Sequence, residues 1–200
     1  MPADVADPGR GPPLVLGNQP ERCPARAAFR NLILATSATH SYFGRNAFER
    51  FAPGLKSLPD ALSARNKVLR AFELAEVEED PRRHRDLLTF VLVGAGPTGV
   101  AMAGALAVLV RTALKSNFRR IDPTSARIVL VDRGPRVLGT FSEDLSQAAK
   151  ERLEELGVEI RLGQSVDQID EHGVVVAGKR ILSKTVIWTA GVAPYRPESG

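Results

Sequence analysis

Residues 87–110 read LLTFVLVGAGPTGVAMAGALAVLV and contain no charged side chain in 24 positions. This length would permit a membrane-spanning helix, which needs about 20 mostly apolar residues. Four glycines and a proline crowd the middle, however, and a helix broken there would leave backbone groups unsatisfied in lipid. Leu, Val and Phe dominate residues 87–93, which favours a buried strand, and Ala, Met and Leu dominate residues 100–110, which favours a helix. The stretch therefore predicts a strand, a glycine-rich turn and a helix.

The turn fits the pattern G-x-G-x-x-G. Its residues are Gly94, Ala95, Gly96, Pro97, Thr98 and Gly99. In a dinucleotide-binding fold the first glycine permits the tight turn, the second lets a pyrophosphate approach the backbone, and the third lets the helix pack closely on the sheet. The N-terminus of the helix then offers free N–H groups and the positive end of its dipole to a phosphate. We predict that these six residues bind a dinucleotide cofactor.

Two alternatives to this interpretation were weighed. The phosphate-binding loop of kinases and ATPases shares the spacing of Gly94 and Gly99, but Val100 and Ala101 stand where it needs Lys and Ser or Thr. No side chain there can reach a γ-phosphate or hold magnesium, which excludes both classes of enzyme. A glycine-rich turn that only packs a helix on a sheet remains the structural alternative.

A dinucleotide fold also needs an acidic residue at the end of its second strand, where it binds the ribose hydroxyls. Residues 127–131 predict that strand, and Asp132 follows it. A carboxylate repels a 2′-phosphate, so Asp132 favours NADH over NADPH. Arg133 opposes this preference, because an arginine can accept the 2′-phosphate. Asp132 is otherwise an ordinary turn residue, and we count both residues as candidate cofactor ligands.

The rest of the chain supplies the remaining elements of such a unit. We expect a helix over residues 142–156 capped by Ser142, a strand over 158–162, short strands over 163–182 that turn at 171–173 and 178, and a strand over 185–189. Upstream, Ser57 and Asp60 predict a capped helix that runs through Val77. The apolar face of that helix is expected at Leu62, Val68, Leu69 and Phe72. The fold class is therefore α/β, a Rossmann-like three-layer dinucleotide-binding unit with a small antiparallel insert.

Three stretches together resemble a known family. They are ILATSATHSYFG (residues 33–44), FVLVGAGPTGVAMAGALA (90–107) and TVIWTAGVAP (185–194). They resemble the flavoproteins with two dinucleotide domains, and most closely the type II NADH dehydrogenases, which are single-chain NADH:quinone oxidoreductases. The resemblance covers roughly residues 31–195. It implies NADH and FAD as cofactors, with hydride transfer from NADH to FAD and then electron transfer to quinone.

In that family an NADH domain is inserted into an FAD domain. The resemblance implies that Ala35 and Thr36 lie beside FAD, and that Thr189, Ala190 and Gly191 lie at the crossover near both cofactors. It also implies the domain organisation. Residues 1–30 are predicted to be disordered or unrelated, 31–85 a remnant of the FAD domain with a connecting helix, 86–190 the NADH domain, and 191–200 the return towards the FAD domain.

The chain departs from the family pattern at several points. No strand–GxGxxG–helix for FAD is found before residue 33, and the chain resembles only the middle of such a protein. Ala101 stands where the family usually has Glu, and Ser37 where it has Gly. Ala101 cannot accept a proton, so we predict no catalytic residue. The alternative function is a catalytically inactive NADH-binding module or a non-functional fragment, which would expose Phe43, Phe48 and Phe51.

Composition excludes other classes of protein. The net charge is +4, and the basic clusters at residues 82–85 and 119–120 are expected in solvated loops. Acidic residues lie nearby and no aromatic residues are interleaved with these clusters, so no nucleic-acid partner is predicted. Cys23 is the single cysteine, which excludes a redox-active C-x-x-C pair and hence the disulfide reductases of this architecture. The three histidines lack metal-ligand spacing, so no metal is predicted.

Residues 1–30 contain no continuous apolar segment of the kind found in signal peptides. We therefore expect a cytoplasmic location without a transmembrane segment. The resemblance adds peripheral association at the inner face of the membrane for the full-length family, and no oligomeric state is predicted.

Overall fold

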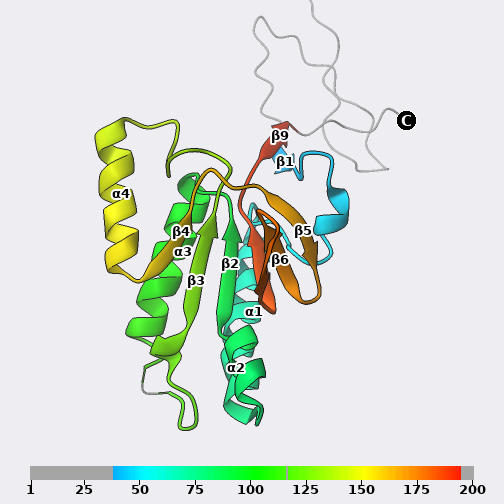
Figure 1. Cartoon of the computed structure of the whole chain (residues 1–200), viewed down its shortest axis with the longest axis vertical. Helices are drawn as coiled ribbons and strands as arrows, with labels where there is room; N and C mark the ends of the chain where they lie inside the picture. The colour runs from blue at the N-terminus through cyan, green and yellow to red at the C-terminus, as the bar shows by residue number, and fades with distance from the viewer. Residues whose placement is uncertain (1–37, 116, 195–200) are drawn as a thin grey trace, which may run out of the picture. The chain divides into compact units, whose positions relative to one another are not determined.

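The computed structural model of the chain describes residues 38–115 and 117–194 (Figure 1). At the centre of this part lies a parallel four-stranded sheet in the order β4-β3-β2-β8. Its strands are β2 (Thr89–Val93), β3 (Arg127–Val131), β4 (Val158–Arg161) and β8 (Thr185–Trp188). Because the strands are parallel, their carboxyl ends meet at one edge of the sheet, where ligands bind in open α/β folds.

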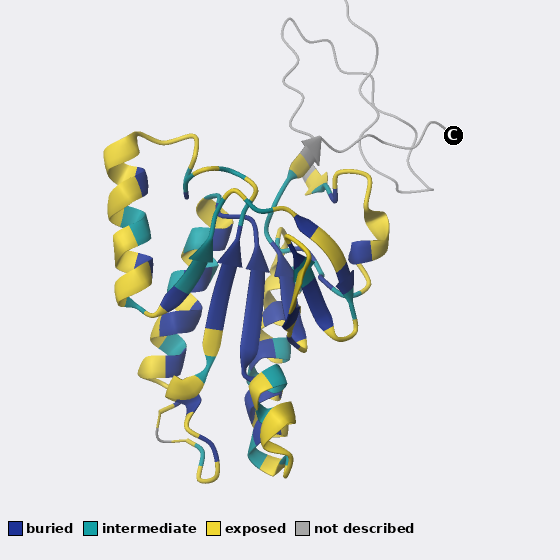
Figure 2. Ribbon diagram, viewed as in Figure 1, coloured by how far each residue is buried: buried dark blue, intermediate teal, exposed yellow. Residues whose placement is uncertain are grey.

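Three helices cover one face of this sheet. They are α1 (Leu58–Val77), α3 (Pro97–Arg111) and α4 (Glu143–Glu155). The short helix α2 (Pro81–Leu87) precedes β2 and has no buried residue. Every residue of β2 is buried (Figure 2). Phe90 and Leu92 belong to the core beneath these helices, and both are fully buried. Two small residues of α3, Ala103 and Ala107, are also buried there, so α3 lies close to the sheet.

A three-stranded antiparallel meander covers the opposite face. Its strands are β5 (Val166–Asp170), β6 (Gly173–Val176) and β7 (Lys179–Leu182). Val91 and Val93 alternate with the residues of the first core and point into a second core against this meander. The three-layer α/β fold predicted from the sequence is thus confirmed.

Two short strands flank this three-layer unit. β1 (Ala38–His40) pairs antiparallel with β9 (Val192–Pro194), so the chain enters and leaves through neighbouring strands. Two 3-10 turns, η1 (Asn46–Phe48) and η2 (Pro123–Ser125), complete the described elements. First and last strands that lie side by side are expected of an inserted domain. Helix α1, however, precedes residue 86 and packs in the same core as the central sheet. The domain boundaries at residues 85 and 190 stay predictions, and the segment 1–30 lies outside the described residues.

Helix α1 begins as predicted. The Ser57 side chain accepts a hydrogen bond from Asp60 N, and the Asp60 carboxylate accepts one from Ser57 N, which together form a capping box. Its buried face differs from the prediction, because Leu62 is 49% exposed and alanines supply most of the contact. The buried residues are Ala64, Val68, Ala71, Phe72 and Ala75. Small residues allow α1 to pack closely, which a search for large apolar side chains misses.

Other local expectations need correction. The basic cluster 82–85 lies in α2 and not in a loop, because Asp80 caps that helix and Pro81 starts it. Strand β2 accordingly begins at Thr89, two residues later than expected. Ser142 occupies the N-cap position of α4, but its side chain makes no capping hydrogen bond.

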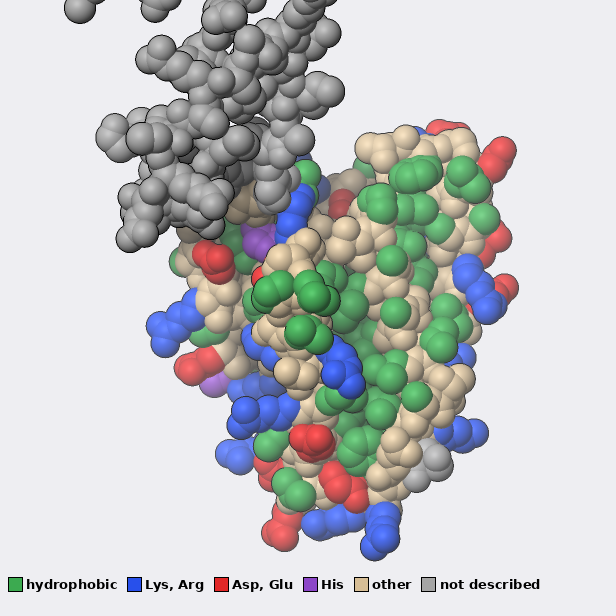
Figure 3. Space-filling view, turned by 180° about the vertical axis from the view of Figure 1, so that it is seen from behind, with side chains coloured by type: hydrophobic (Ala, Val, Ile, Leu, Met, Phe, Trp, Pro, Cys, Tyr) green, Lys and Arg blue, Asp and Glu red, His purple; other side chains and the backbone are tan. Residues whose placement is uncertain are grey.

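The helical layer also carries exposed apolar side chains, and the view from behind shows hydrophobic side chains gathered down the middle of that face (Figure 3). Those on helices are Leu58, Leu62, Leu74, Val77, Val108 and Leu145. Among the described residues, no helix combines the length and apolarity needed to cross a bilayer.

Candidate functional site

The glycine turn joins β2 to α3 at the carboxyl edge of the sheet, and two of its glycines are required by the protein's own packing. Gly94 has a φ of +114°, and a Cβ there would lie 2.6 Å from the backbone nitrogen of Ala190. A Cβ on Gly99 would overlap the carbonyl oxygen of Gly94 and lie 2.7 Å from Thr189 Oγ1. The roles predicted for the first and third glycines, a tight turn and close helix packing, therefore agree with the geometry.

Gly96 differs from both. Its φ of −74° and ψ of −176° are extended angles that any residue adopts, and a Cβ would meet no heavy atom within 4 Å. Neither conformation nor packing calls for glycine here. Gly96 is the N-cap of α3, whose first N–H groups have no partner within the helix. The open space beside Gly96 is therefore next to a helix end that favours anions.

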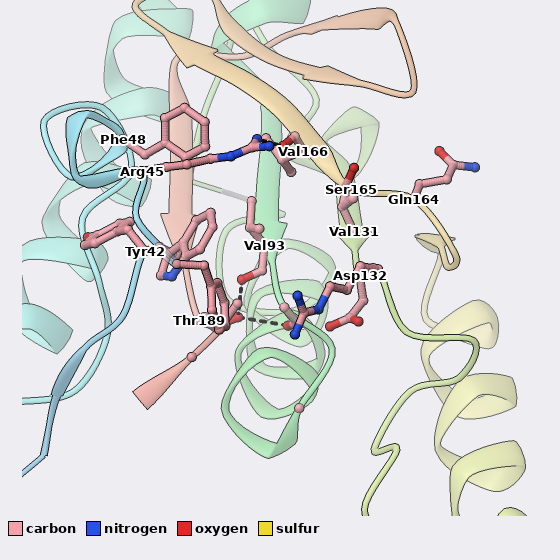
Figure 4. Close-up of a pocket in the computed structure, with 17 residues that line it drawn as sticks. Tyr42, Arg45, Phe48, Val93, Val131, Asp132, Gln164, Ser165, Val166 and Thr189 are labelled. Carbon is pink, nitrogen blue, oxygen red and sulfur yellow. Dashed lines mark hydrogen bonds between the residues drawn. The ribbon is translucent and has the colours of Figure 1, made fainter. Parts of the chain in front are cut away.

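A cavity of about 490 Å³ opens beside this turn (Figure 4). Of the residues predicted from the sequence, those that line it are Gly94, Gly96, Asp132, Arg133, Thr189, Ala190 and Gly191. Ala95, Pro97 and Gly99 do not line it, because they form the far side of the turn and the first turn of α3. The structure thus brings the ends of β2, β3 and β8 together around one cavity.

Asp132 has a structural partner that the sequence did not indicate. Its Oδ2 accepts a hydrogen bond of 2.6 Å from Ala95 N, and its Oδ1 accepts one of 2.5 Å from Gly134 N. Each carboxylate oxygen therefore fixes a backbone N–H, one in the glycine turn and one in the loop after β3. The side chain still lies at the edge of the cavity, where a ribose would approach it.

The crossover after β8 is also tied to the turn. Thr189 Oγ1 lies 2.9 Å from Val93 O and 2.8 Å from Gly94 O, so its hydroxyl can donate to either carbonyl (Figure 4). Gly191 has a φ of +70°, which suits glycine. These residues line the cavity, and their position near both cofactors stays a prediction. Ala101 is exposed on α3 and does not line the cavity, and Ala35 and Thr36 lie outside the described residues.

The sequence analysis missed one wall of the cavity, which the segment 41–51 provides. Tyr42 packs against Trp188 with ring centroids 5.1 Å apart, and its hydroxyl donates to Ala52 O at 3.0 Å. Burial raises the pKa of Tyr42 to about 12. Arg45 donates to the carbonyl oxygens of Val166 and Asp167, which fastens the segment to β5 (Figure 4). The two hydrogen bonds of Arg45 join positions more than 120 apart in the chain, so no local pattern indicates them.

The phenylalanines of this segment are mostly covered. Phe48 is buried and Phe51 is half-buried in the core beneath the meander, so the expectation that both are exposed was wrong. Phe43 alone agrees with it, with 54% of its surface exposed at the mouth of the cavity.

A second cavity, of about 140 Å³, lies on the other side of the crossover and includes His40, Lys56 and Thr98. His40 Nε2 lies 3.2 Å from Asp60 Oδ2, which also accepts a hydrogen bond of 2.8 Å from Ser57 N. That backbone hydrogen bond is the main cause that lowers the pKa of Asp60 to about 2. Asp60 is therefore ionised near neutral pH and anchors the histidine to the start of α1.

The sequence matches known proteins over most of its length. A family model described as pyridine nucleotide-disulphide oxidoreductase matches residues 12–198. The chain is 48% identical over 173 residues to the type II NADH:quinone oxidoreductase Ndh of Mycobacterium tuberculosis, which covers 84% of this chain and 37% of that protein. It is 42% identical over 170 residues to NdhA of the same organism, with 82% and 36% covered. The chain therefore spans little more than a third of the length of these curated relatives.

The structure of NDH2 from Plasmodium falciparum in complex with NADH has a similar fold. Its TM-score is 0.73 at 25% sequence identity, and the match covers 79% of this chain and 34% of that one.

Proposed function

The chain belongs to the pyridine nucleotide-disulphide oxidoreductase family, and on this basis we propose that residues 86–190 hold NADH for an FAD-dependent NADH:quinone oxidoreductase. When bound, NADH supplies a hydride, which in the proposed reaction passes to FAD, and the electrons then pass to quinone. The names of the relatives from Mycobacterium tuberculosis support this assignment of substrate and acceptor. The work of this chain is to bind and orient the nucleotide.

One observation carries the proposal. Gly96 is a glycine that neither the backbone conformation nor the packing of the protein requires, and it faces a cavity at the N-terminus of a 15-residue helix. A dinucleotide explains it, because the diphosphate must approach the backbone where a side chain would otherwise stand. The first turn of α3 would then bind the phosphate oxygens through its N–H groups.

The residues around Gly96 fit the rest of the nucleotide. Asp132 lies where the adenosine ribose is expected, at the end of β3. The crossover residues Thr189 and Gly191 lie on the opposite side of the turn, at the end of β8. A dinucleotide laid along the carboxyl edge would therefore run from Asp132 past Gly96 to the crossover.

A second candidate function is a catalytically inactive NADH-binding module, and Ala101 favours it. Its methyl group cannot donate or accept a proton, and it is exposed on α3 outside the cavity. The visible absorbance spectrum of the purified chain separates the two functions. A flavin spectrum that bleaches on anaerobic addition of NADH supports the reductase, whereas a colourless protein that binds NADH supports the module.

For the complete enzyme we further propose a cytoplasmic location with peripheral association at the inner face of the membrane. The support is chemical, because a quinone acceptor dissolves in the bilayer and must be met at its surface.

Substitution of Gly96 tests the nucleotide site. We expect Gly96→Val to abolish NADH binding and Gly96→Ala to weaken it, measured by titration of nucleotide fluorescence. The matched control is Gly104→Ala, since a Cβ at Gly104 would meet only Leu153 Cδ2 at 3.8 Å and lies outside the cavity. Circular dichroism should show all three variants folded. A Gly96→Val chain that binds NADH as tightly as the wild type would refute the site.

A further inference from the structure

Arg133 reaches across the glycine turn. It follows β3, and its guanidinium carbon lies 4.9 Å from the centre of the Phe43 ring. Phe43 packs on the crossover after β8, because a Cβ on Gly191 would lie 2.7 Å from Phe43 Cζ. In the sheet, β2 lies between β3 and β8. The Arg133 side chain therefore extends from the end of β3 over the end of β2, where Gly94 and Gly96 form the turn.

The charge of Arg133 is not used by the fold. Within residues 38–115 and 117–194, its guanidinium makes no hydrogen bond or ion pair, and it lies over the face of Phe43 as a cation–π partner. Its neighbour Asp132 is engaged at both oxygens by Ala95 N and Gly134 N. Arg45, the other arginine at the cavity, donates to two carbonyl oxygens of the β5 region. Of the two arginines that line the cavity in the described part of the chain, Arg133 is therefore the one whose charge is available over the turn.

Phe43 has an unusual backbone conformation. Its φ of +51° is rare for a bulky residue, and Gly44 follows with a φ of +83°. The two residues are the central positions of a tight turn, which a hydrogen bond of 3.0 Å from Arg45 N to Tyr42 O closes. This turn places the Phe43 ring, 54% of which is exposed, at the mouth of the cavity.

We propose that Arg133 supplies the counter-charge for the diphosphate of the bound dinucleotide, and that Phe43 is a positioning residue that holds the guanidinium over the glycine turn. This inference rests on the proposed NADH site. A guanidinium presents several N–H donors in one plane and suits two phosphate groups. The helix N-terminus at Gly96 would bind the diphosphate from the protein side, and Arg133 would cover it from the solvent side.

The direction of the side chain distinguishes this role from recognition of a 2′-phosphate. A 2′-phosphate belongs to the adenosine ribose, which is expected beside Asp132 at the end of β3. The guanidinium lies instead on the side of β8, against Phe43 and the crossover. Arg133 should therefore contribute equally to the binding of NADH and NADPH.

Titration of Arg133→Gln with NADH, NADPH and ADP-ribose tests the assignment. We expect all three affinities to fall by a similar factor of about ten, because each ligand carries the diphosphate. Arg133→Lys should restore part of the loss. The matched control is Arg50→Gln. Arg50 also lies over an aromatic ring, that of Phe51 at 5.4 Å, and its substitution removes the same charge at a position outside the cavity. Unchanged affinity, or a loss confined to NADPH, would overturn the proposal.

A double-mutant cycle tests the positioning role. Phe43→Leu keeps an apolar side chain but removes the aromatic face, so it should weaken ADP-ribose binding when Arg133 is present and have no effect in the Arg133→Gln background. An equal effect in both backgrounds would overturn the role of Phe43. Unfolding by urea shows whether each variant is folded.

If the wild-type chain binds no NADH, the proposed function itself fails. If it binds NADH as tightly as Arg133→Gln does, only this inference fails.

Discussion

Removal of the Asp132 carboxylate should destabilise the glycine turn before any nucleotide binds. Its two oxygens accept hydrogen bonds of 2.6 Å from Ala95 N and 2.5 Å from Gly134 N. Ala95 is only 2% exposed with the carboxylate in place, so its N–H depends on that acceptor. In Asp132→Ala both donors lose their acceptor, and only water from the adjoining cavity can take its place.

The size of the effect follows from these environments. A buried donor without an acceptor costs about 1–3 kcal/mol, and the half-buried Gly134 N–H should cost less because water reaches it. We therefore expect Asp132→Ala to lower the free energy of unfolding by about 2–3 kcal/mol. Asp132→Asn keeps one acceptor oxygen, so about half of that loss is expected.

Urea unfolding followed by circular dichroism measures both variants without nucleotide. Asp167→Ala is the control, because Asp167 accepts a hydrogen bond of 3.0 Å from Gly178 N at the surface, where the change should cost less than about 0.5 kcal/mol. Binding of NADH and NADPH to Asp132→Asn tests the second role of the residue, since loss of the charge should relax the preference for NADH. An Asp132→Ala chain with unchanged stability would refute the structural role.

Two further predictions concern the stability of the fold. Gly99→Ala should lower the urea midpoint and weaken NADH binding together, because its Cβ would overlap the Gly94 carbonyl oxygen, and overpacking typically costs about 1–3 kcal/mol; a variant as stable as the wild type would contradict the packing. Asp170 has its pKa lowered from 3.8 to about 2 by hydrogen bonds from Arg180, so the stability that it contributes is present above about pH 4 and is lost as the pH falls towards 2. The difference in urea midpoint between wild type and Asp170→Asn should therefore shrink between pH 7 and about pH 2, and a difference that is the same at both values would argue against the linkage.

The elements that local patterns determine were predicted well. Residues 127–131 form β3 with the bounds expected from their run of apolar residues. The capping box at Ser57 and the turn–helix junction at Pro97 also agree, because caps and first turns depend on neighbours three or four positions away. That residues after β2, β3 and β8 line one cavity could be predicted for a different reason, because the carboxyl ends of parallel strands meet at one edge of a sheet.

The remaining part of the site depends on contacts between distant segments. The segment that carries Tyr42 and Phe48, which we predict to be part of an FAD-domain remnant, forms a wall of the cavity beside β5. Its position is fixed by a hydrogen bond from Arg45 to Val166 and by packing against Trp188. Neither contact leaves a periodic signal in the sequence. The same holds for Asp132, because its hydrogen bond from Ala95 N depends on the register between β2 and β3.

The three glycines of the motif illustrate what a sequence pattern can and cannot indicate. Gly94 and Gly99 are required by a positive φ and by close packing, so a chain with no ligand would still need them to fold. A Cβ at Gly96 would meet no heavy atom within 4 Å, so a chain that had lost nucleotide binding could replace this glycine without unfolding. Two glycines of the motif therefore indicate the fold, and Gly96 alone indicates a ligand. Because Gly96 is present although Glu is absent at Ala101, nucleotide binding is the function that this chain's residues support most directly.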